Sequence, residues 1–67
     1  MAKITLEAAR VNAGLTQSQL AKEMGVSRQS VFDWENGKRE MKTAYVYAFC
    51  QLTGFSVDDI LLPKKST

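Results

Sequence analysis

One pattern of residues recurs at three places in the chain and constrains its fold more than any other feature. It consists of an apolar residue, a Ser or Thr, three further residues and a second apolar residue. The hydroxyl in such a pattern caps a helix by accepting a hydrogen bond from a first-turn amide, and the flanking apolar residues pack across the cap. Thr16, Ser27 and Ser56 are therefore predicted N-caps. Gln19 and Asp59 stand where they complete a capping box with the first and the last of these. The segments are LTQSQL at 15–20, VSRQSV at 26–31 and FSVDDI at 55–60.

Glycine and proline mark the ends of the same segments. A glycine that follows a helix adopts the left-handed conformation without a Cβ clash. The glycines in such positions are Gly14, Gly25, Gly37 and Gly54, and Pro63 follows the last segment. Since no segment shows the apolar and polar alternation of a half-buried strand, we expect an all-α fold. The five predicted helices span 4–13, 17–24, 28–36, 43–53 and 57–61.

Composition limits the class of protein. A chain of 67 residues that is 45% hydrophobic and 24% charged is expected to form one small domain over 1–67, with a frayed polar tail at 62–67. No apolar run reaches the ~18 residues of a membrane span, and the N-terminus lacks a secretory signal, so we expect a cytoplasmic protein. The chain has one cysteine and no histidine, the commonest general base and metal ligand. We therefore expect neither an enzyme nor a metal or cofactor site.

A very short connection joins the second and third predicted helices. Only Gly25 and Val26 separate Met24 from Ser27, so the two helices must meet at a sharp angle. Ala21 is small enough to allow their close approach. The apolar residues available for a shared contact are Leu20, Met24, Val26, Val31 and Trp34.

The third predicted helix has one apolar face and one polar face. Val31 and Trp34 fall on the stripe that helical periodicity assigns to the core. Arg28, Gln29 and Asp33 then lie on the opposite side. A polar edge of this kind, carried by a sharply bent pair of helices, is available to bind a partner.

The segment GLTQSQLAKEMGVSRQSVFDWENGKR at 14–39 resembles the helix-turn-helix of the Cro/cI-type (XRE) family of phage repressors and bacterial regulators. GLTQ, GVS and WENGK occur at the family spacing, and the likeness continues through GFSVDDIL. The resemblance implies a compact five-helix, lambda-repressor-like DNA-binding domain, encoded by a bacterium or a phage. The chain departs from the family before the fourth helix, where Met41 and Lys42 replace a common proline and capping residue.

The resemblance implies a set of DNA base contacts, because family members place the second helix of the motif in the major groove. Arg28 is suited to a bidentate contact with guanine O6 and N7, and Gln29 to one with adenine N6 and N7. Asp33 can accept from cytosine N4, although phosphates repel its carboxylate. We expect Asp33 to favour discrimination at the expense of affinity. The predicted base contacts are Ser27, Arg28, Gln29 and Asp33.

A second set of residues is expected to contact the DNA backbone. Gln17 begins a helix, whose N-terminus favours a phosphate. Four of the nine basic residues fall between 28 and 42, which predicts a positive stripe although the net charge is only +2. Contacts of this kind set register and salt dependence without reading sequence. The predicted backbone contacts are Gln17, Ser30, Asn36, Lys38, Arg39 and Lys42.

Two further features have alternative interpretations. The resemblance pairs Arg10 with Glu35 in a structural ion pair, whereas unconnected surface charges are the alternative. Phe32 lies one step off the buried stripe. It either covers the edge of the core or contacts a thymine methyl or a sugar, and the sequence does not decide between these roles.

The fourth helix contains more apolar surface than one core can cover. Tyr45, Tyr47 and Phe49 cannot all face the same side, and Leu61 and Leu62 follow near the end of the chain. We expect the surplus to form a homodimer, at least on DNA, because family members bind palindromic operators.

Two functions follow from these features. The first is a sequence-specific transcriptional regulator of double-stranded DNA, most simply a repressor. The alternative is an antitoxin-like or other interaction module, whose fourth and fifth helices bind a partner protein while DNA binding provides autoregulation.

Overall fold

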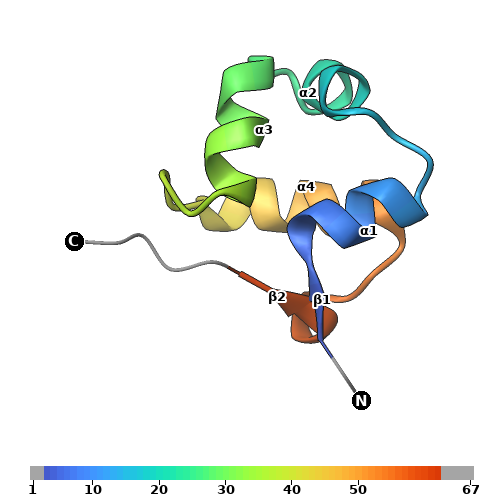
Figure 1. Ribbon diagram of the computed structural model, residues 1–67. Coiled ribbons are helices and arrows are strands. Elements are labelled where there is room, and N and C mark those ends of the chain that lie inside the picture. The colour runs from blue at the N-terminus through green and yellow to red at the C-terminus, as the bar shows by residue number, and fades with distance from the viewer. Residues whose placement is uncertain (1–2, 63–67) are drawn as a thin grey trace.

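The computed structural model describes residues 3–62, and within them the chain forms four α-helices, one 3-10 helix and two short strands (Figure 1). Residues 1–2 and 63–67, the latter containing most of the predicted tail and Pro63, lie outside the described residues. The elements are β1 (Ile4–Thr5), α1 (Leu6–Asn12), α2 (Gln17–Met24), α3 (Arg28–Glu35), α4 (Thr43–Thr53), η1 (Val57–Asp59) and β2 (Ile60–Leu61). The α2 and α4 bounds match the predicted helices.

Two of the three predicted N-caps are confirmed. The Thr16 hydroxyl accepts from the amide of Gln19 at 3.0 Å, and the Gln19 side chain accepts from the amide of Thr16 at 2.8 Å, which completes the capping box. The Ser27 hydroxyl accepts from the amide of Ser30 at 3.1 Å. Because both caps are local to their helices, α2 and α3 have fixed starting points.

The turn between α2 and α3 depends on Gly25. This residue ends α2 with φ of 71°, in the left-handed region that favours glycine. The amide of Val26 then donates to the carbonyl of Ala21 at 3.0 Å, which closes the turn. Ala21 itself is buried between the helices. The sharp bend predicted from the sequence is therefore present.

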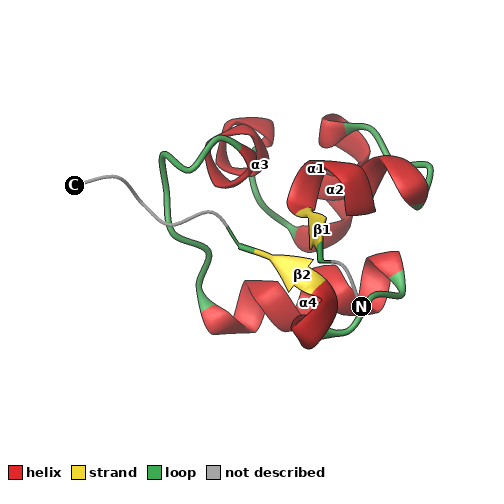
Figure 2. Cartoon of the chain, turned by 60° about the horizontal axis from the view of Figure 1, so that its bottom comes forward, coloured by secondary structure: helices red, strands yellow, loops and turns green. Residues whose placement is uncertain are grey.

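The prediction of a fifth α-helix at 57–61 is wrong. Ser56 makes no side-chain cap, because its hydroxyl donates to the Asp59 carboxylate at 3.0 Å instead of accepting from a backbone amide. Only a three-residue 3-10 helix forms. Ile60 then becomes extended and pairs with Ile4 in a parallel ribbon, which gives the otherwise helical fold a small sheet (Figure 2).

The same ribbon shortens the first helix. The sequence predicts that this helix begins at residue 4, but Ile4 and Thr5 form β1. Thr5 then caps α1 by accepting from the amide of Ala8 at 3.1 Å. The sequence also predicts no strands, and this prediction is wrong. The two strands are too short to show an alternating pattern in the sequence.

The core lies between the four helices and includes the inner side of the ribbon. α4 packs against α1 and α2, and the Trp34 and Tyr45 rings, 5.3 Å between centroids, join α3 to α4. Burial raises the pKa of the Cys50 thiol, and the negative charge of Asp59 adds to the rise. Cys50 is a free, buried cysteine of the core. The buried apolar residues are Leu6, Ala9, Leu20, Ala21, Val31, Trp34, Val46, Phe49, Cys50 and Ile60.

Candidate nucleic-acid interface

The N-terminal end of α3 is an exposed polar edge. Ser27, Arg28 and Gln29 are all exposed, whereas Val31 and Trp34 on the opposite side of the helix are buried. Figure 1 shows α2 and α3 together on one side of the molecule, with the ribbon on the opposite side. Within the described chain, no other element covers this edge.

Gln29 and Asp33 interact on the surface of α3. The Gln29 Nε2 donates to Asp33 Oδ1 at 2.9 Å, across one helical turn. Gln29 keeps its amide oxygen and one amide proton for other contacts. One oxygen of the half-buried Asp33 carboxylate therefore accepts a hydrogen bond from Gln29, and this bond restricts the orientation of the Gln29 side chain.

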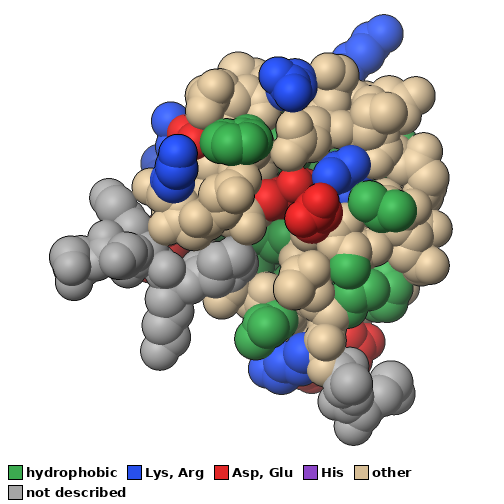
Figure 3. Space-filling model, viewed as in Figure 1, with side chains coloured by type: hydrophobic (Ala, Val, Ile, Leu, Met, Phe, Trp, Pro, Cys, Tyr) green, Lys and Arg blue, Asp and Glu red, His purple; other side chains and the backbone are tan. Residues whose placement is uncertain are grey.

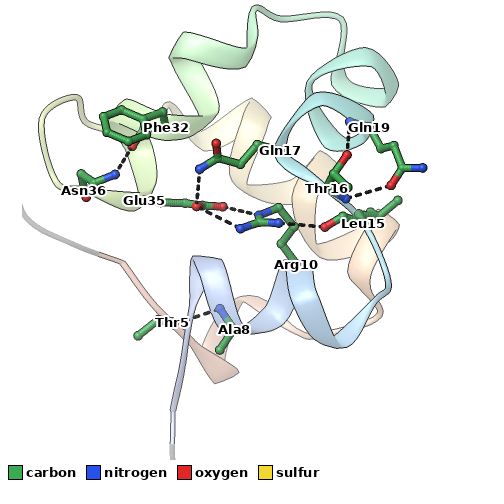
Figure 4. Close-up of polar contacts among 10 residues, drawn as sticks. All are labelled: Thr5, Ala8, Arg10, Leu15, Thr16, Gln17, Gln19, Phe32, Glu35 and Asn36. Carbon is green, nitrogen blue, oxygen red and sulfur yellow. Dashed lines mark hydrogen bonds and ion pairs between the residues drawn. The ribbon is translucent and has the colours of Figure 1, made fainter.

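The loop after α3 folds back onto this helix. The Asn36 Nδ2 donates to the carbonyl of Phe32 at 2.8 Å (Figure 4), and the Asp33 carbonyl accepts from the amides of Lys38 and Arg39 at 2.9 and 3.3 Å. The Lys38 ammonium lies 5.5 Å from the centre of the half-buried Phe32 ring. Such a contact is a cation–π interaction. These bonds fix the basic loop beside the exposed edge.

Ser30 has its partners inside the protein. It is 8% exposed, and its hydroxyl lies 3.0 Å from the Ser27 hydroxyl and accepts from Arg39 Nη1 at 2.9 Å. A DNA backbone contact by Ser30 itself stays a prediction. Lys42, the last residue of the loop, is exposed and stands at the N-cap position of α4 without forming a side-chain cap.

A buried ion pair joins α1 to α3. The Arg10 Nε donates to Glu35 Oε2 at 2.6 Å, and its Nη1 donates to the carbonyl of Leu15 at 2.8 Å. The side chains of Arg10 and Glu35 are 10% and 4% exposed, so the alternative of unconnected surface charges does not hold. The charge of Arg10 is compensated inside the molecule and adds little to the surface potential.

Gln17 extends this network to the start of α2. Its Nε2 donates to Glu35 Oε1 at 3.0 Å, so Glu35 accepts from side chains of both α1 and α2 (Figure 4). The second amide proton of Gln17 has no partner in this network and remains available. The ion pair therefore holds Gln17 at the N-terminus of α2, where backbone amides favour an anion.

Basic side chains extend from the exposed edge to the loop. Figure 3 shows Lys and Arg side chains over α3 and the loop that follows it, along the upper and left margins of the view. The exposed cations of this part are Arg28, Lys38, Arg39 and Lys42. Hydrogen bonds and a shared hollow thus bring together Ser27, Ser30, Arg39 and Lys42, and Gln29 meets Asp33 on the surface of α3.

Three contacts of this site were missed by sequence reasoning. The spacing of four residues between Gln29 and Asp33 was a usable signal, since such residues are neighbours on a helix. The bonds between Gln17 and Glu35 and between Ser30 and Arg39 join different elements. No sequence periodicity relates these pairs.

The fold and the exposed α3 edge define the chain as a helix-turn-helix domain. A helix-turn-helix family model matches residues 6–60. An uncharacterized HTH-type transcriptional regulator of Methanocaldococcus jannaschii is 35% identical over 48 residues, which are 72% of this chain and 73% of that protein. The chain belongs to the XRE-type helix-turn-helix family, whose members are DNA-binding transcriptional regulators.

In the described part of the chain, no helix is long and apolar enough to span a membrane.

Proposed function

We propose that this protein is a sequence-specific transcriptional repressor that inserts α3 into the major groove of its operator and occludes a promoter. The observation that carries this proposal is the exposure of Arg28 and Gln29 at the N-terminus of α3, opposite the buried Trp34. Helix-turn-helix proteins contact base edges with this end of the second motif helix.

The proposed base contacts are made by four residues. Arg28 donates to a guanine, and Gln29 uses its free amide oxygen and proton on an adenine. The bond from Gln29 to Asp33 supports this role, because it restricts Gln29 before DNA binds. Ser27 contacts the neighbouring base, and Asp33 disfavours sequences that do not offer a cytosine amine.

The proposed backbone contacts flank α3 on both sides. Gln17 binds a phosphate at the start of α2, and the loop after α3 binds the next phosphates along the strand. The bonds that fold this loop onto α3 support the second contact, since they fix the positions of the cations. Lys38→Ala is expected to weaken binding to all duplexes alike and to flatten the salt slope by about one. The proposed loop contacts are Asn36, Lys38, Arg39 and Lys42.

The proposed regulator binds a palindromic operator as a homodimer. Phe49 is fully buried, but Tyr47 is 58% and Leu61 51% exposed, and Val57 and Leu62 are also exposed. This surplus of apolar surface supports self-association away from α3. Two copies related by a two-fold axis would meet half-sites about one DNA turn apart.

Selection of bound duplexes from a random pool tests the proposal. We expect the wild-type protein to enrich a palindrome with half-sites ~10 base pairs apart. Arg28→Ala, the control, should enrich a site that has lost one preferred base pair in each half. Failure of the wild-type protein to enrich any sequence would overturn the proposal of sequence-specific binding. A reporter whose promoter overlaps the enriched site should be silenced by the protein, whereas activation would overturn the repressor role.

A further inference from the structure

A chain of hydrogen bonds connects the basic loop to the start of α3. Arg39, which is exposed and lies in the loop, donates to the buried Ser30 hydroxyl at 2.9 Å. Ser30 lies 3.0 Å from the hydroxyl of Ser27, the residue that caps α3. Three side chains from two elements thus form one continuous chain.

We propose that Ser30 is a positioning residue for DNA binding, whose hydroxyl holds the Arg39 guanidinium beside the N-terminus of α3 so that Arg39 binds a backbone phosphate there. Ser30 then acts through Arg39 and does not itself contact the phosphate. This inference rests on the proposed function, because it concerns the same DNA-binding surface.

The hydrogen-bonding capacity of Arg39 fixes the direction of its bond to Ser30. A guanidinium can only donate, so the Ser30 hydroxyl is the acceptor. The Ser27 and Ser30 hydroxyls lie within hydrogen-bond distance of each other, where either can donate, and the Ser27 oxygen also accepts from the Ser30 amide. Arg39 therefore presents the cationic donors of this chain to an anion.

The surroundings of Arg39 favour a phosphate. Its guanidinium uses one of five donors on Ser30 and keeps four. A hollow of about 360 Å³ lies beside it, with Lys42 as a second cation and Glu40 as the opposing charge. Trp34 and Tyr45 form its apolar wall. A planar guanidinium held at the rim of this hollow is suited to bidentate binding of a phosphate.

Loss of the Ser30 hydroxyl should leave Arg39 charged but free to move. The protein must then immobilise a long side chain when DNA binds, which we expect to weaken affinity about threefold to tenfold. The salt slope should stay unchanged, because the number of cations that neutralise phosphates is the same.

A double-mutant cycle on the selected duplex tests this inference. Ser30→Ala, Arg39→Ala and the double variant are titrated at several salt concentrations, with Ser56→Ala, just before η1, as a serine control. We expect Arg39→Ala to flatten the salt slope by about one. Ser30→Ala should weaken binding in the wild-type background and have no effect in the Arg39→Ala background. Ser30→Thr, which keeps the hydroxyl, should bind more tightly than Ser30→Ala.

An equal loss from Ser30→Ala in both backgrounds would overturn the inference, whether Ser30 contacts the phosphate directly or only stabilises the fold. Thermal unfolding of the same proteins separates those two explanations, since only the second lowers the unfolding temperature in proportion to the lost affinity. Absence of duplex binding by the wild-type protein would overturn the proposed function as well. If the wild-type protein binds the duplex but Ser30→Ala costs the same affinity in both backgrounds, this inference alone would be overturned.

Discussion

The α2–α3 pair and the terminal ribbon of β1 and β2 are stabilised by different kinds of contact. α2 and α3 begin at hydroxyl caps and meet at a left-handed glycine, so their geometry is determined within a short stretch of chain. The ribbon joins Ile4 to Ile60 from opposite ends of the described residues. The proposed DNA-binding pair is therefore built from local contacts, whereas the ribbon depends on the completed fold.

The largest expected effect concerns the ion pair that connects the α2–α3 pair to α1. Glu35→Ala leaves Arg10 buried without a compensating charge and releases Gln17, so we expect a loss of ~3–5 kcal/mol in the free energy of unfolding. Urea denaturation measures this loss. Glu23→Ala, at an exposed position of α2, is the control and should change stability by less than ~0.5 kcal/mol. Similar values for both variants would show that the pair does not stabilise the fold.

The ribbon gives the next effect. Ile60 is 3% exposed, and Ile60→Ala should cost roughly 2–3 kcal/mol through lost burial and the resulting cavity. Its neighbour Leu61 is 51% exposed, so Leu61→Ala should cost less than ~1 kcal/mol. Urea denaturation of the two variants tests the register of the ribbon. A larger loss for Leu61→Ala would contradict the pairing of Ile60 with Ile4.

The smallest expected effects on stability come from one threonine and one serine, Thr16 and Ser56, which contrast directly. Thr16→Ala removes a complete capping box and should cost about 1 kcal/mol. Ser56→Ala removes a hydroxyl that caps no backbone amide and should cost less than ~0.5 kcal/mol. Thermal unfolding compares the two. Equal losses would mean that Ser56 caps η1 in solution, contrary to the structure.

The same contrast explains what the sequence could predict. The sequence predicts the caps Thr16 and Ser27 because a cap, its partner amide and its apolar staple lie within six residues. Ser56 has the same pattern, but Ile60 is buried and pairs in the ribbon with Ile4, which lies near the other end of the described residues. A one-dimensional pattern contains no information on that pairing. The strands were missed for the same reason.

Some features of the candidate site could likewise be predicted from the sequence, and others could not. The exposed edge of α3 followed from helical periodicity, whereas the ion pair of Arg10 and Glu35 came from the family resemblance. The bond from Arg39 to Ser30 depends on how the loop after α3 folds back through the carbonyl of Asp33. Because this loop has no regular period, the partners of its side chains can be identified only from the structure.

Titration of Arg28→Ala against the selected operator and its single-base-pair variants tests the central claim, that the exposed edge of α3 reads sequence. We expect a loss of ~1–3 kcal/mol on the selected operator and loss of preference at one base pair in each half-site. The fold should be unchanged, because Arg28 is exposed. A folded variant that keeps full discrimination at every position, or loses affinity equally for all duplexes, would contradict the account.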